Sequence, residues 1–164
     1  MAISVKFINP FITAACKVLK EEIEAEITRG EVSLEKSGTT SKEVTVALGV
    51  PGEVRGGVFY GFSEQSARSL VSEMLGEPVP IFDELAESGI GEMGNVITGL
   101  ATAELEQKGL LCRIAPPTVV TGKGVYISTL DFHRLIMPLE TQYGAIEVNV
   151  ALKPMNREAK TSRN

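Results

Sequence analysis

One stretch of the chain, residues 83–109, constrains the fold more than any other because its pattern requires a long amphipathic helix. Asp83 is a suitable N-cap, and Gly109 is a suitable C-terminal stop. Glu84 and Glu87 lie in the first turn, where carboxylates interact favourably with the helix dipole. At about 100° per residue, one side of this helix carries a broad apolar stripe: Ala86, Ile90, Met93, Ile97, Leu100 and Ala101. The stripe predicts that the helix packs on a core.

The opposite side of the same helix carries a polar row: Ser88, Glu92, Asn95 and Gly99. Three glycines each cost about 1 kcal/mol relative to alanine inside a helix: Gly91, Gly94 and Gly99. Glycine removes side-chain bulk and lets another surface come close to the backbone. Two interpretations stay open on these residues alone. The row is either a solvated helix face with tolerated glycines, or a docking surface from which Glu92 and Asn95 reach a partner.

Composition limits the functions that the chain can serve. Its 164 residues are 43% hydrophobic, which predicts a single domain over residues 1–154. The polar segment 155–164 has little to bury, and we expect it to be disordered. The net charge of −5, without a basic face, argues against nucleic acid as a partner. The chain begins without a signal peptide and has no run of about 18 apolar residues, so we expect a cytoplasmic protein that does not bind membranes.

Local signals predict two further helices. We expect a short strand at residues 3–7. Asn9 and Pro10 are suited to open the first helix after it, and we expect this helix to end at Gly30. Ser63 is suited to cap the second helix, and Gly76 is suited to end it.

Segments with a period of two predict the strands: residues 32–34, 44–48, 58–60, 111–114, 119–120, 125–130, 135–139 and 146–152. We expect the first three to form an antiparallel meander, with turns at residues 37–40 and 50–53. The last strand is long and regular, which favours an edge position and a route to a homodimer. Together the elements predict an α+β fold in which helices pack on a mainly antiparallel sheet, in two similar halves.

Several motifs can be set aside on their context. Residues 89–94 read G-x-G-x-x-G, but a dinucleotide fingerprint follows a strand and opens a helix, whereas this one lies inside a helix. Residues 122–124 lack the remainder of a P-loop. Cys16 and Cys112 lie in apolar surroundings, which indicates free thiols, and the single His133 has no histidine partner for a metal site or a triad.

The spacing of Ser88, Glu92 and Asn95 resembles the signature of the CheC, CheX and FliY phosphatases of bacterial chemotaxis, which continues to a proline further along the chain. Pro117 lies one residue short of that proline's place. The resemblance extends over nearly the whole chain to about Lys153, through three segments: residues 5–11, 56–62 and 117–122. The two-site members carry a second Glu/Asn pair on the first helix. That pair is missing here, so the chain looks most like CheX, which is known as a homodimer.

The resemblance implies hydrolysis of the phosphoaspartate on a CheY-like receiver. It implies that Asn95 orients the attacking water and that Glu92 pairs with the lysine of the receiver. Partner contacts are implied for small residues of the row, namely Ser88, Gly91 and Gly99, with Gly94 also giving room. The protein itself then needs no metal or cofactor, because Mg²⁺ is expected on the receiver. The alternative is a non-catalytic module of the same fold that binds a receiver or a flagellar component.

Overall fold

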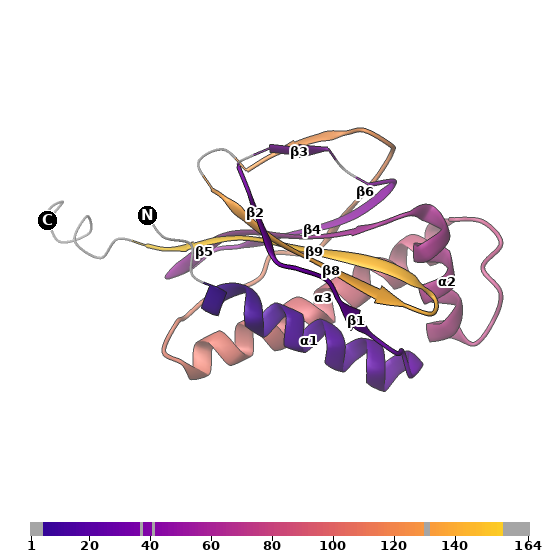
Figure 1. The fold of residues 1–164 in the computed structure, drawn as a ribbon, viewed down its shortest axis with the longest axis horizontal. Coiled ribbons are helices and arrows are strands. Elements are labelled where there is room, and N and C mark those ends of the chain that lie inside the picture. The colour runs from indigo at the N-terminus through magenta and orange to yellow at the C-terminus, as the bar shows by residue number, and fades with distance from the viewer. Residues whose placement is uncertain (1–4, 37, 41, 130–131, 156–164) are drawn as a thin grey trace, which may run out of the picture.

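A computed structural model describes residues 5–36, 38–40, 42–129 and 132–155 (Figure 1). Within them the helices are α1 (Val5–Ile23), α2 (Glu64–Leu75) and α3 (Glu84–Gln107). The strands are β1 (Thr28–Arg29), β2 (Ser33–Glu35), β3 (Gly38–Thr40), β4 (Val44–Val50), β5 (Val54–Phe62), β6 (Thr118–Thr121), β7 (Tyr126–Ser128), β8 (Arg134–Thr141) and β9 (Gly144–Pro154). Apart from Met155, the predicted disordered tail lies outside the described residues. No helix of the described segments is long and apolar enough to cross a bilayer.

The fold is a layered α+β arrangement, as predicted. The main sheet is antiparallel and has the order β1-β8-β9-β5-β4-β6, with β2 also paired to β8. Figure 1 shows α1 and α3 on one side of this sheet, whereas β3 lies on the other side, where it pairs with β7. Each long helix is followed by strands, α1 by β1 to β5 and α3 by β6 to β9, in keeping with two similar halves.

Two predictions about the sheet are wrong. The last strand is not an edge, because β9 lies between β8 and β5. Its alternating apolar residues belong to the core, and Asn149 and Ala151, which alternate with them, are buried as well. The predicted meander is also only half right. The β4–β5 hairpin is present, whereas β2 pairs with β8 and not with β4. An alternating pattern does not show which strands pair.

The first helix differs from its prediction at both ends. Residues 5–7 are helical instead of forming a strand, and Pro10 lies inside α1. Proline in a helix interior costs about 3 kcal/mol. Burial of Phe7 and Ile8 in the core offsets this cost, at roughly 1.5–3 kcal/mol for each side chain. The helix ends at Ile23, before Glu24 adopts a positive φ of 52°, and residues 28–29 form β1.

Of the remaining local predictions, those for the helix caps are confirmed and two for strands and turns are wrong. Ser63 and Asp83 cap α2 and α3, each accepting a hydrogen bond from a backbone N–H three residues on. Gly76 ends α2 in the left-handed conformation, with φ of 72°. By contrast, residues 38–40 form β3 instead of a turn. In place of a strand at 111–114 there is one isolated bridge, between Gly52 and Cys112.

Candidate functional site

Helix α3 is fixed to the sheet by Tyr60 of β5. The hydroxyl groups of Tyr60 and Thr98 are hydrogen-bonded at 2.7 Å, and both residues are fully buried. A Cβ atom at Gly94 would lie 2.8 Å from Cγ1 of Val46 and 3.2 Å from Cδ2 of Tyr60, so no side chain fits there. Gly94 therefore lets the helix approach the sheet. The expectation that Gly94 gives room to a partner is wrong.

Glu92 lies on the exposed side of α3, and Asn95 lies at the border of its buried side. Glu92 is exposed and Asn95 is half-buried. Neither side chain has a hydrogen bond or ion pair with any residue that the structure describes. Side chains three residues apart on a helix are neighbours, with Cβ atoms about 5–6 Å apart. The two groups can therefore act together on one partner.

An open groove of about 480 Å³ adjoins this pair. It is lined by Glu84, Glu87, Ser88, Gly91, Glu92, Pro117 and Val119. Ser88 and Glu92 are thereby brought together with Pro117, which lies far along the chain just before β6. Gly91 forms the buried side of the groove, where a Cβ atom would contact Cγ2 of Val119 at 3.4 Å. The lining contains three carboxylates and no basic side chain, so the groove favours a cationic group of a partner.

Two members of the predicted site lie outside the groove lining. Asn95 is one turn beyond Glu92, and Gly99 follows one turn later, with nothing within 4 Å of a Cβ atom built on it. The sequence did not predict Glu84 and Glu87 as lining residues of the groove. Their presence in the first turn was already explained by the favourable interaction of carboxylates with the helix dipole. The sequence did not predict Val119 either, because only the sheet order brings β6 beside α3.

The apolar stripe of α3 is buried as predicted, with the exception of Leu100. Leu100 is exposed, as are Leu85 and Val96 on the same helix. The buried side of α3 is therefore wider than the predicted stripe and shifted away from Leu100, because it also includes small and polar residues: Gly91, Gly94, Thr98 and Thr102.

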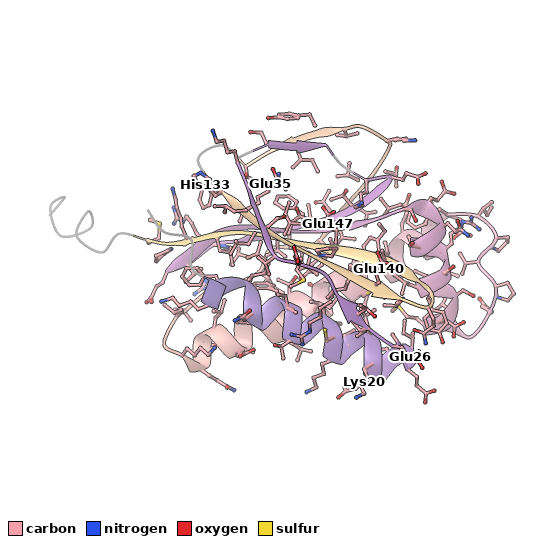
Figure 2. The ribbon with its side chains drawn as sticks, in the orientation of Figure 1. Lys20, Glu26, Glu35, His133, Glu140 and Glu147 are labelled. Carbon is pink, nitrogen blue, oxygen red and sulfur yellow. The ribbon has the colours of Figure 1, made fainter. Side chains whose placement is uncertain are left out.

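A polar network lies on the other side of the main sheet. The buried Arg134 guanidinium donates a hydrogen bond from Nη1 to Oδ1 of Asn149 at 2.8 Å, and Asn149 donates from Nδ2 to Oε1 of Glu147 at 3.2 Å. Burial lowers the pKa of Arg134, and the carboxylates of Glu35 and Glu147 oppose that shift. Figure 2 shows Glu35, His133 and Glu147 on the side of β3, opposite the helices. This network is therefore separate from the groove on α3.

The described residues contain no cluster of three or more His, Cys, Asp or Glu side chains that could hold a metal ion. His133 is exposed. Both cysteines are free thiols, as predicted, and burial raises the pKa of the Cys112 thiol. The chemistry that the site offers is therefore that of a carboxylate and a carboxamide held on a rigid helix beside an acidic groove.

Comparison with known proteins assigns the family. The model of the family described as chemotaxis phosphatase CheX matches residues 44–140, which include α2, α3 and the groove. The CheY-P phosphatase CheX of Thermotoga maritima is 30% identical over 125 residues, which are 76% of this chain and 81% of the relative.

Two solved structures have the same fold. The CheC-like superfamily protein from Shewanella sp. PV-4 is 31% identical, with a TM-score of 0.84, over 92% of this chain and 99% of that chain. A chain of the CheX–CheY–BeF₃–Mg²⁺ complex from Borrelia burgdorferi is 29% identical, with a TM-score of 0.79, over 92% of this chain and 99% of the other. Since the family model spans more than half of the sequence and the Thermotoga relative covers more than two thirds, this chain belongs to the CheX family of chemotaxis phosphatases.

Proposed function

We propose that this protein is a phosphatase that hydrolyses the phosphoaspartate of a CheY-like receiver domain. The observation that carries the proposal is the pair formed by Glu92 and Asn95, whose side chains have no partner among the described residues and project from a helix fixed to the sheet. Membership of the CheX family supports it, as does the CheY-P phosphatase activity of the Thermotoga relative.

The reaction needs little from the phosphatase. The oxygen of a water molecule forms a bond to phosphorus while the bond between phosphorus and the aspartate oxygen breaks. The bonding electrons stay on the aspartate carboxylate, and a water proton passes to the phosphate product. A carboxamide both donates and accepts hydrogen bonds, so Asn95 can hold this water in line with the breaking bond.

Glu92 has a different part in the proposal. Its carboxylate is exposed and lies one turn before Asn95, where it can pair with the lysine beside the phosphoaspartate of the receiver. This contact sets the register in which Asn95 enters. Ser88 and Gly91 line the groove next to Glu92, and Gly99 adds open space beyond Asn95. These small residues leave room for the partner.

In this proposal the magnesium ion is bound by the receiver and not by the phosphatase. The Borrelia complex contains CheX, CheY, BeF₃ and Mg²⁺, and a BeF₃ group has the shape and charge of a phosphoryl group. Mg²⁺ neutralises charge on a transferring phosphoryl group, so a receiver that holds the ion already supplies the electrostatic part of catalysis. Positioning of the water is then the contribution that remains for Asn95.

The test is the rate of phosphate release from a phosphorylated receiver. We expect Asn95→Ala to lower the rate constant of hydrolysis at saturating enzyme by about 100-fold, because the reaction slows by about this factor when the attacking water is no longer held in position. The free energy of unfolding should change by about 0.5 kcal/mol or less, as for other surface positions. An unchanged hydrolysis rate with retained receiver binding would instead assign the chain to the alternative class, a non-catalytic binding module.

A further inference from the structure

Three large apolar side chains of α3 are exposed beside the candidate site. The exposed fractions are 54% for Leu85, 39% for Val96 and 41% for Leu100. Single exposed hydrophobic residues are common on soluble proteins and need no explanation. These three differ because they lie on one helix together with Glu92 and are all exposed.

At about 100° per residue, helical spacing places Leu85 and Val96 within about 40° of Glu92 around the helix, and Leu100 about 80° from it, on the side of Glu92 away from Asn95. Val96 follows Glu92 by one turn, and Leu100 follows Val96 by another turn. Leu85 precedes Glu92 by two turns. Apolar side chains therefore lie on both ends of the segment that contains Glu92 and Asn95, over a length of about 22 Å at 1.5 Å per residue. A partner surface that covers Glu92 therefore comes close to these side chains as well.

The polar pair alone is a weak means of holding a partner. Glu92 is exposed, and an ion pair between exposed groups gains little because water and salt screen it. Asn95 is expected to bind one water molecule. Burial of apolar surface, in contrast, contributes in proportion to the area removed from water. Beside the acidic groove, Leu85, Val96 and Leu100 are therefore a second source of affinity for a partner at this face.

We propose that Leu85, Val96 and Leu100 form the apolar docking strip for the phosphorylated receiver, and that they contact apolar side chains bordering its phosphorylation site. This inference rests on the proposed function, because the occupant follows from the partner of Glu92 and Asn95. Binding and chemistry are then divided between neighbouring residues of one helix. The strip contributes to affinity for the receiver, and Asn95 determines the rate of hydrolysis in the bound complex.

The division predicts a particular kinetic signature. The double variant Val96→Thr and Leu100→Gln keeps the approximate side-chain size and the helix but removes apolar surface. With a receiver phosphorylated by acetyl phosphate, we expect KM to rise about 10-fold, the equivalent of about 1.4 kcal/mol of binding free energy, with kcat unchanged. Leu111→Gln is the matched control, because Leu111 is 46% exposed but lies beyond the end of α3, and it should leave KM unchanged.

The remaining outcomes separate this inference from the proposed function. An unchanged KM in the double variant, with activity still lost in Asn95→Ala, overturns the docking strip alone. If the unmodified protein releases no phosphate, the proposed function fails, and binding of the BeF₃-treated receiver then tests the strip directly. Weaker binding of that complex by the double variant supports the strip. A change in the oligomeric mass of the double variant shows that the strip covers a second copy of the chain, and overturns the inference.

Discussion

Tyr60 contacts α3 at two points that lie on either side of Asn95 in the sequence. Its ring packs against the backbone at Gly94, and its hydroxyl is hydrogen-bonded to Thr98. The hydroxyl is protonated at neutral pH, as in any tyrosine, and burial, the main cause that raises the pKa of Tyr60 above 10.0, extends this range to more alkaline pH. The turn of helix that carries Asn95 is therefore fixed relative to the central strands.

The Tyr60 hydroxyl also makes the free energy of unfolding depend on pH in the alkaline range. The folded state holds its proton more tightly than the unfolded chain, whose tyrosine pKa is near 10.0. This contribution is fully present below pH 10 and decreases as the pH rises towards the higher folded-state pKa. We expect the free energy of unfolding to fall by up to about 1.4 kcal/mol per pH unit above pH 10.

Urea denaturation across this pH range tests the prediction. Tyr60→Phe removes the titrating group, so its stability should fall less steeply than that of the unmodified protein. The decline due to Cys112, whose pKa burial raises from 9.0, should persist in both proteins. Equal slopes for the two proteins would assign the alkaline decline to other groups.

At the same scale, the sequence pointed to candidate residues more readily than to their packing. Glu92 and Asn95 were identifiable as candidates because their spacing is local to one helix and resembles a known signature, and their roles stay predictions. The role of Gly94 was not identifiable, because its close neighbours, Val46 and Tyr60, belong to strands far away in the chain. A glycine in a sequence shows that space is needed but not what fills it.

Within helix α3, the glycines fall into two kinds. Gly94 is packed against Val46, a stiff side chain of a buried strand, whereas Gly99 faces open space. Alanine at either position gains about 1 kcal/mol of helix propensity. At Gly94 this gain is outweighed by overpacking, which costs roughly 1–3 kcal/mol.

Thermal unfolding of two matched variants tests this difference between Gly94 and Gly99. We expect Gly94→Ala to lower Tm and Gly99→Ala to raise it, although both make the same chemical change in one helix. If Gly94→Ala is as stable as Gly99→Ala, the helix does not pack on the sheet as closely as described.

Element boundaries were predictable wherever the signal is local. The caps at Ser63 and Asp83 depend on residues within one turn, and they were predicted correctly. The start of α1 was predicted wrongly, because Asn9 and Pro10 give a strong local signal that burial of Phe7 and Ile8 outweighs. Tertiary packing decides such cases, and it is not visible in a window of a few residues.

For the whole molecule, the layered class and the family were predicted, but the order of strands was not. The resemblance to CheX is confirmed by the family model and by the relatives. The edges of the main sheet are β6 on one side and the short strands β1 and β2 on the other, so dimerisation through β9 is excluded. Strand order depends on contacts between distant segments, which an alternating pattern does not encode.

The homodimer itself stays a prediction, now without the β9 edge as its route. Exposed apolar side chains on β2 and β7, Leu34 and Tyr126, provide another surface for it. Light scattering at micromolar concentration should give twice the chain mass of 17.6 kDa. A mass equal to one chain at that concentration would count against the dimer.

The close packing at Gly94 has a consequence for how such proteins change over generations. Gly94 is required by the sheet beneath the helix, whereas Asn95, the next residue, is required only by the proposed chemistry. A descendant that kept the fold but gave up catalysis would lose the selection on Asn95 and retain the selection on Gly94. Glycine without the neighbouring asparagine would then mark lineages that have turned from hydrolysis to binding alone.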